Sequence, residues 1–203
     1  MARAGGEIRF SELCRAADIS KSTLDYNLTI LASNGIITRD RGLIRLEYKT
    51  PLCYIFDSPR TRASYAYLGL LGERSGRSES ETETAINLLG EEGFVFSRVA
   101  VVTTHRCAAE WEGVAPGSVD WFLLKDEEIS LVEVIEARVE ASLSDLLRNY
   151  VLIMDCTSAT KPATIAYYRL ATRHKIPLVY VYEKKKELTW IISREDLRGE
   201  LVG

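Results

Sequence analysis

The apolar run Val151–Met154 is the feature that most constrains how this chain can fold. A short, uninterrupted apolar run is typical of a fully buried strand. Asp155 ends the run, and Pro162 follows at a position suited to the first turn of a helix, where its missing N–H costs least. The apolar residues after it recur at helical spacing: Ala163, Ala166, Tyr167, Leu170 and Ala171. The stretch therefore predicts a strand, a polar loop and a helix.

The loop between this strand and this helix has the composition of an anion-binding site. It is rich in hydroxyl groups, and Lys161 adds a positive charge. At such a junction in an α/β sheet, free backbone N–H groups and the positive end of the helix dipole face one point. We therefore predict that the loop binds a phosphate group. Its predicted ligand-binding residues are Asp155, Thr157, Ser158, Ala159, Thr160 and Lys161.

A second strand–loop–helix unit precedes this one in the chain. Residues 66–71 form an apolar run, residues 72–78 a basic, hydroxyl-rich loop, and residues 79–90 a helical pattern. Residues 99–104 read as the next buried strand. This order predicts an α/β fold with a Rossmann-like, mostly parallel sheet. The predicted ligand-binding residues of the second loop are Gly72, Arg74, Ser75, Gly76, Arg77 and Ser78.

Both loops follow buried strands, so we expect them at the carboxyl edge of the sheet, where α/β proteins bind ligands. Neither loop has the Gly-x-Gly-x-x-Gly pattern of dinucleotide-binding domains or a Walker sequence, and no cofactor is predicted. Hydroxyls, amides and cations together suit phosphodiesters. The competing interpretation is that the serines and threonines only cap two helices.

The rest of this half of the chain leaves one alternative open. Residues 119–124 and 176–182 read as strands, and residues 188–192 as a last, antiparallel edge strand. Residues 129–147 form either one helix or a strand followed by a helix. Residues 53–56 read as a short strand within a connector.

The first fifty residues predict two helices followed by a hairpin. Residues 10–17 show a short helical pattern, and Ser20 is a suitable N-cap for a second helix. A hairpin is predicted between residues 36 and 46. This order resembles winged-helix domains, which place the second helix in the DNA major groove and the hairpin on the backbone. The predicted DNA-binding residues are Lys21, Tyr26, Asn27, Arg39 and Arg41.

The alternative role for these fifty residues is dimerisation or packing. The exposed face of the second helix carries one cation and one anion, Lys21 and Asp25, so the helix alone would attract DNA phosphates weakly. The domains predicted from these patterns are a winged helix-turn-helix segment at 1–48, a connector at 49–65 and a Rossmann-like domain at 66–203.

Composition narrows the class of protein. The net charge of −3 does not favour a general nucleic-acid binder. The four cysteines include no Cys-x-x-Cys pair and only two histidines are present, so neither a disulfide framework nor a metal site is predicted. No apolar run has membrane-spanning length and the start is no signal peptide, so we expect a cytoplasmic protein with no membrane partner.

The two loops together resemble those of the CRISPR-associated Rossmann fold, or CARF, family. The segment from Leu71-Gly72 to Glu81-Thr82 and its apolar helix is similar to the family's first motif, and Asp155–Lys161 matches the polar positions of an Asp-x-Thr-x-x-x-Lys motif. The resemblance spans about residues 66–193. It implies a homodimer that binds cyclic tetra-adenylate or hexa-adenylate on its two-fold axis as a sensor in type III CRISPR signalling.

Some members of the CARF family are ring nucleases, which cleave their ligand without a metal. In them the ribose 2′-OH attacks the adjacent phosphorus and a 2′,3′-cyclic phosphate results, with a Ser and a Lys on the phosphate. The matching positions are Ser75, or Ser78, and Lys161. The resemblance leaves open whether the ring is cleaved or only bound.

Two other functions remain as alternatives. The first is a DNA-binding transcription factor without a nucleotide ligand. The second is a degenerate relative of the metal-dependent nucleases related to archaeal Holliday junction resolvases, because Asp120 and Glu133 have the spacing of two of their carboxylates. Ile135 stands where those enzymes have a lysine, so an active nuclease is not predicted.

Overall fold

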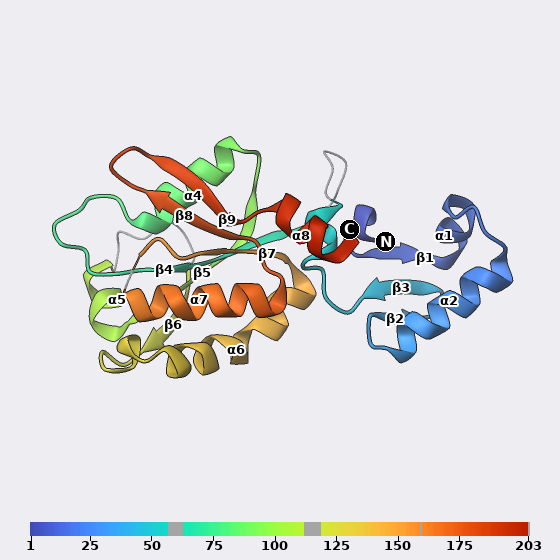
Figure 1. The fold of residues 1–203 in the computed structure, drawn as a ribbon, viewed down its shortest axis with the longest axis horizontal. Helices are drawn as coiled ribbons and strands as arrows, with labels where there is room; N and C mark the ends of the chain where they lie inside the picture. The colour runs from blue at the N-terminus through green and yellow to red at the C-terminus, as the bar shows by residue number, and fades with distance from the viewer. Residues whose placement is uncertain (57–62, 112–118, 159, 203) are drawn as a thin grey trace.

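The computed structural model describes residues 1–56, 63–111, 119–158 and 160–202. Its largest element is a six-stranded sheet of order β6-β5-β4-β7-β8-β9 (Figure 1). The strands are β4 (Tyr65–Leu70), β5 (Phe96–Thr104), β6 (Val119–Leu124), β7 (Val151–Asp155), β8 (Leu178–Tyr182) and β9 (Glu187–Ile192). All neighbouring pairs are parallel except β8 and β9, which run antiparallel. The predicted α/β fold with a mostly parallel sheet is confirmed, as is the antiparallel edge strand.

Helices cover both faces of this sheet, as parallel strands require. They are α4 (Glu81–Glu91), α5 (His105–Trp111), α6 (Val132–Asn149), which follows the short 3-10 helix Glu128–Ser130, α7 (Lys161–His174) and α8 (Arg194–Val202). Helices α6 and α7 lie side by side on one face, and α4 lies on the other (Figure 1). None of the helices described by the structure is both long and apolar enough to cross a membrane.

The packing of strand β7 explains why its first four residues are apolar. Leu152 and Met154 point into the core under α6 and α7, whereas Val151 and Ile153 join the core on the opposite face. All five residues of the strand are buried. A central parallel strand buries both faces, so the alternation of a half-exposed strand is absent.

The N-terminal unit is built on a second, three-stranded antiparallel sheet of order β1-β3-β2. Its elements are a 3-10 helix (Ala2–Ala4), β1 (Glu7–Arg9), α1 (Phe10–Ala16), α2 (Lys21–Ser33), β2 (Ile37–Asp40) and β3 (Leu43–Leu46). The Ser20 hydroxyl accepts a hydrogen bond from the Thr23 N–H at 3.1 Å and so caps α2, as predicted. This unit lies at the end of the molecule opposite α5 (Figure 1). The two predicted helices and the hairpin are therefore present.

Two expectations about the connecting segments are settled by tertiary packing. Residues 53–56, predicted as a strand, instead belong to the short helix α3 (Leu52–Ile55) and the residue after it. This prediction was wrong because Cys53, Tyr54 and Ile55 are all buried beside α8, which a four-residue helix allows and an alternating strand would not. Residues 129–147 carry no strand, since Ile135, Val139 and Leu143 fall four apart on one buried face of α6.

The connector is fastened to the start of β7. The Lys49 N–H donates to the Leu147 carbonyl oxygen at 2.7 Å. The Thr50 hydroxyl oxygen accepts from the Leu152 N–H at 2.8 Å, and this hydroxyl donates to the Tyr150 carbonyl oxygen at 3.3 Å. The N-terminal unit is thereby tied to the strand that carries the predicted phosphate loop at its other end.

Candidate ligand-binding site

A pocket of about 400 Å³ lies at the carboxyl edge of the large sheet. The loops after β4 and β7, predicted from sequence to lie at this edge, both line it. The residues after β5 and β6 contribute as well. From the predicted residues the lining includes Gly72, Ser75, Arg77, Ser158 and Thr160; the other lining residues are Leu71, Glu73, Glu81, Thr104, Arg106, Cys107, Asp126 and Ile129.

A direct hydrogen bond joins the two loops. The Gly72 N–H donates to the Ser158 hydroxyl oxygen at 2.8 Å, and Ser158 is buried. The Gly72 carbonyl oxygen accepts from the indole N–H of the buried Trp111 at 3.0 Å. The loop after β4 is therefore held at Gly72 from two sides. Strands β4 and β7 are hydrogen-bonded neighbours, which brings these distant segments together.

Asp155 shapes the β7 loop from below the pocket. Its carboxylate is completely buried and accepts hydrogen bonds from the Tyr67 hydroxyl at 2.5 Å and from the Thr157 N–H at 2.8 Å. The Thr157 hydroxyl also donates to it and accepts from the Val181 N–H at 2.8 Å. Asp155 and Thr157, predicted as ligand contacts, thus face each other and the neighbouring strands. In this structure they hold the loop in shape.

Burial also changes the acidity of Asp155. Removal from water disfavours the charged form and raises the pKa of its carboxyl from 3.8 to about 6, although the hydrogen bonds from Thr157 and Tyr67 work in the opposite direction. Glu81, whose negative charge lies nearby, adds to the increase in pKa. The loop is therefore organised around an acid that titrates close to neutral pH.

The N-terminus of α7 offers fewer free N–H groups than the sequence suggested. The Thr160 hydroxyl accepts from the Ala163 N–H at 3.4 Å and donates to the Ile129 carbonyl oxygen at 2.6 Å, and Pro162 has no N–H. Lys161 is exposed and does not belong to the pocket lining. Ala159 lies outside the described residues. Fewer N–H groups are therefore free to bind an anion than at an uncapped helix end, because the Thr160 cap occupies one of them and Pro162 has none.

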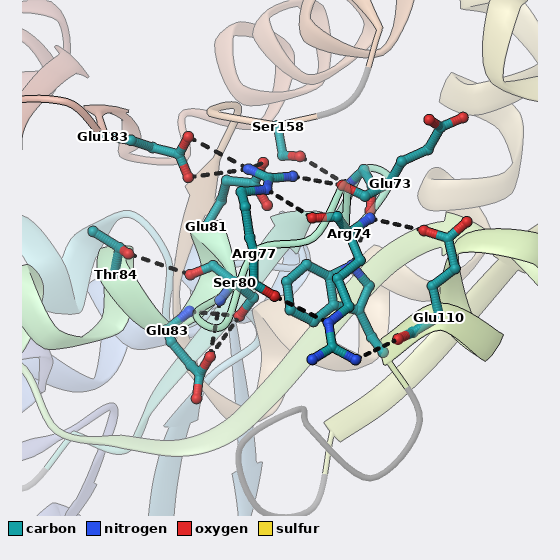
Figure 2. Close-up of polar contacts among 12 residues, drawn as sticks. Glu73, Arg74, Arg77, Ser80, Glu81, Glu83, Thr84, Glu110, Ser158 and Glu183 are labelled. Atoms are coloured by element: carbon teal, nitrogen blue, oxygen red, sulfur yellow. Dashed lines mark hydrogen bonds and ion pairs between the residues drawn. The ribbon is translucent and has the colours of Figure 1, made fainter.

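The loop after β4 is organised by arginines (Figure 2). Arg77 forms an ion pair with Glu81, reaches Glu183 at 3.3 Å, and donates to the Glu73 carbonyl oxygen at 2.6 Å. Arg74 donates through Nε to the Arg77 carbonyl oxygen at 3.0 Å, and its guanidinium lies 5.7 Å from the Trp111 ring. Both predicted phosphate-binding arginines are therefore already engaged by acceptors of this chain.

The same loop contains the remaining predicted residues. Ser75 lines the pocket with a left-handed backbone (φ 46°), and Gly76 follows in the same region (φ 76°). A serine in this region costs energy relative to glycine, whereas Gly76 adopts it freely. Ser78 is exposed and outside the pocket lining.

The pocket residues missed from the sequence are mostly charged. Arg106 forms an ion pair with Glu73 and lies 4.0 Å from Asp126. Glu81 is the first residue of α4, after the N-cap Ser80. Polar residues just after the buried strand 99–104 are a signal that could have located Arg106, because that strand too ends at the carboxyl edge. The pocket lining therefore holds the carboxylates of Glu73, Glu81 and Asp126 beside two arginines.

The two carboxylates on which the alternative nuclease prediction depends do not form a metal site. Asp120 on β6 accepts from Arg98 at 2.7 Å. Glu133 is on helix α6, 82% exposed, with Arg169 at 3.9 Å. Among the residues described, no three His, Cys, Asp or Glu side chains lie together in a way that could hold a metal ion.

The predicted DNA-binding residues lie on the N-terminal unit. Lys21, Tyr26 and Asn27 are exposed on α2. Arg39 of β2 forms an ion pair with Asp25 at 2.6 Å, and Arg41 is exposed in the hairpin turn. The charge of Arg39, one of the two cations predicted on the hairpin, is thus partly neutralised by Asp25 of α2.

No protein-family model matches this sequence, and no curated protein was found to be related to it. Solved structures that are similar to part of the fold include the three that follow. Protein VC1899 from Vibrio cholerae shares 11% identity over 64% of this chain and 34% of its own, with a TM-score of 0.49. Can2 from Sulfobacillus thermosulfidooxidans, in complex with cyclic tetra-adenylate, shares 15% identity over 64% of this chain and 35% of its own, with a TM-score of 0.44.

The third similar structure is Csm6 from Enterococcus italicus, bound to cyclic hexa-2′-fluoro-hexa-dAMP. It shares 9% identity over 68% of this chain and 45% of its own, with a TM-score of 0.48. This chain therefore spans less than half the length of each of the three proteins.

Proposed function

We propose that this chain is a sensor that binds a cyclic oligoadenylate in the pocket between the loops after β4 and β7. The observation that carries the proposal is the Gly72–Ser158 hydrogen bond, which joins two polar loops of adjacent parallel strands into one pocket. Sites at the carboxyl edge of such sheets bind nucleotides and other phosphorylated ligands. The CARF-like residues Asp155–Lys161 form one of these loops and support the choice of ligand.

The charges of the pocket suit a ligand that both accepts and donates hydrogen bonds. Arg77 and Arg106 are each held by carboxylates of the chain. A nucleotide phosphate can replace a carboxylate on an arginine because both present two oxygens to the guanidinium. The released carboxylate then needs a donor, which a nucleoside supplies through its amine and hydroxyl groups. The mixed charge of the pocket is thus compatible with a nucleotide, although not with a bare anion.

The size of the pocket supports a homodimer as the binding species. A pocket of 400 Å³ has the volume that proteins use for one small ligand. A ring of four or six nucleotides has several times the volume of one nucleotide, so one pocket of this size holds only part of the ring. A two-fold dimer presents each loop twice, which matches the even symmetry of such a ring.

Thermal unfolding in the presence of ligand tests the proposal. We expect cyclic tetra-adenylate or cyclic hexa-adenylate to raise the melting temperature, and linear oligoadenylate of the same length to do so less. Ser158→Ala removes the hydroxyl that joins the loops and should reduce the shift, whereas Ser144→Ala on the exposed side of α6 should not. Absence of a shift with either ring would reject the sensor function.

The output of the sensor is proposed to be DNA binding by the N-terminal unit. The division into residues 1–48, a connector at 49–65 and an α/β domain at 66–203 belongs to this proposal. The observation in its favour is the connector, since Thr50 bonds to the strand that ends at Asp155. A gel-shift assay at about 150 mM salt, with and without the ring, tests it. Identical DNA binding with and without the ring would show that the ring does not control DNA binding by the N-terminal unit.

Ring cleavage remains a prediction of the resemblance alone. Ser75 lines the pocket, but Lys161 does not. Chromatography of the ring after incubation with the protein decides the question, since cleavage would release linear products with a 2′,3′-cyclic phosphate.

A further inference from the structure

Glu81 is buried at the wall of the pocket with half of its hydrogen-bonding capacity unused. Its side chain is 7% exposed and lines the pocket. One carboxylate oxygen, Oε1, pairs with Arg77, whereas Oε2 has no hydrogen-bond partner among the described residues. Buried polar atoms in folded proteins are nearly always hydrogen-bonded, so an unsatisfied one at a pocket calls for a donor from outside the chain.

Helix capping does not account for this carboxylate. The N-terminus of α4 is capped by Ser80, whose hydroxyl accepts from the Glu83 N–H at 3.1 Å, and the Glu83 carboxylate accepts from the Ser80 N–H at 2.9 Å. The capping box is therefore complete without Glu81. An acidic residue in the first turn gains from the helix dipole, but an exposed side chain would gain as well without the cost of burial.

Arg77, the side chain that pairs with Glu81, is one that a ligand phosphate can attract away from it. Arg77 contacts Glu81 and also Glu183, which lies in the turn after β8 (Figure 2). Burial raises the pKa of the Glu183 carboxyl, and the nearby negative charge of Glu81 adds to the increase. Two carboxylates thus share one guanidinium. Movement of Arg77 to a ligand phosphate would open Glu81 to the pocket.

We propose that Glu81 accepts a hydrogen bond from the exocyclic amine of an adenine base once Arg77 has moved to a phosphate of the ligand. The inference rests on the proposed function, and it names the group that selects adenine. The donors of a cyclic oligoadenylate are its 6-amino groups and its 2′-hydroxyls. The amine lies on the base edge far from the phosphates, where a carboxylate does not repel them; the 2′-hydroxyl lies beside a phosphate.

Three cyclic tetranucleotides test the inference by calorimetry on the unmodified protein. The first is cyclic tetra-adenylate, the second is the same ring built from purine riboside, which lacks the amine, and the third is the 2′-fluoro adenine ring, which lacks the hydroxyl donor. We expect loss of the amine to weaken binding about tenfold or more, as expected for a lost hydrogen bond to a charged group. The 2′-fluoro ring should bind within about threefold of the parent.

Substitution of Glu81 should remove the discrimination. In Glu81→Met the ratio of affinities for the adenine and purine rings should approach one, and Glu81→Gln, which keeps an acceptor oxygen, should retain part of it. Glu79→Gln is the matched control, because Glu79 precedes the same helix, is 42% exposed and lies outside the pocket. Its ratio should equal that of the unmodified protein.

The outcomes separate the inference from the function on which it rests. If neither these rings nor the corresponding hexanucleotide rings bind, the proposed function is wrong and the inference falls with it. If the adenine and purine rings bind equally well, or if only the 2′-fluoro ring binds poorly, the sensor stands and the role of Glu81 is overturned. An unchanged ratio in Glu81→Met also overturns it. Should that variant not fold, the comparison of the three rings on the unmodified protein still decides the result.

Discussion

The two loops of the pocket are held by different physical means. The loop after β7 is fixed by hydroxyl groups and backbone N–H groups around the buried carboxyl of Asp155. The loop after β4 is fixed by ion pairs and carbonyl contacts of Arg74 and Arg77 near the surface. Buried hydrogen bonds are expensive to break, whereas a guanidinium that already contacts two carboxylates can exchange one acceptor for another without being left unpaired. The first loop is therefore a rigid frame, and the second is the part that can rearrange.

The largest expected effect comes from removal of the Asp155 carboxyl. At about pH 5, Asp155→Ala leaves the Tyr67 hydroxyl and the Thr157 N–H without an acceptor inside the core, and should lower the free energy of unfolding by about 2–4 kcal/mol. Asp126→Ala at the exposed pocket edge should change it by less than about 0.5 kcal/mol. Urea unfolding measures both. Equal losses would show that the buried carboxyl of Asp155 does not hold the loop after β7 in shape.

The titration of Asp155 gives the next largest effect. Because the folded pKa of about 6 lies above 3.8, the folded protein binds this proton more tightly than the unfolded chain does. The resulting stabilisation is complete below about pH 4 and is lost as the pH rises through 6, a loss of about 3 kcal/mol. Subtraction of the Asp155→Asn profile from that of the unmodified protein isolates this slope. Parallel profiles would show that the carboxyl does not titrate in this range.

Arg77→Gln tests the exchangeable loop. The variant leaves Glu81 buried without its cation and should lower the free energy of unfolding by about 1–2 kcal/mol. The double variant with Glu81→Gln should recover most of the loss, because no buried charge is then left alone. Arg45→Gln, at an exposed pair with Glu7, serves as the control and should have almost no effect. Additive losses in the double variant would mean that the two side chains act independently.

The smallest effect on stability is expected for Lys161. This side chain is exposed at the N-terminus of α7, so Lys161→Ala should change stability by less than about 0.5 kcal/mol. It should weaken ring binding severalfold through the loss of a nearby cation, less than Arg77→Gln does. Lys184→Ala, in the exposed turn after β8, is the matched control. Complete loss of binding in Lys161→Ala would place the main phosphate contact on the β7 loop.

The frame of the site was predictable because its signals are local. The apolar run of β7, the cap at Thr160 and Pro162 mark a strand and a helix without knowledge of any distant residue. The charged pairs were not predictable because they depend on strand order. Arg77 follows β4 and Glu183 follows β8, and they meet because a single strand, β7, separates β4 from β8. Arg106 follows β5 and meets Glu73 because β5 lies next to β4. The strand predicted for residues 53–56 was wrong because tertiary packing, which the local sequence does not reveal, decides their conformation.

The double burial of β7 also fixes the spacing between the connector and the pocket. Thr50 bonds at one end of this strand, and Asp155 ends it at the edge of the sheet where the pocket lies. Insertion of one residue in β7 would turn Ile153 and Met154 toward the wrong faces of the sheet, since side chains alternate with a period of two. The strand therefore tolerates substitutions of similar volume but no change in length. Its length is a fixed property of the molecule.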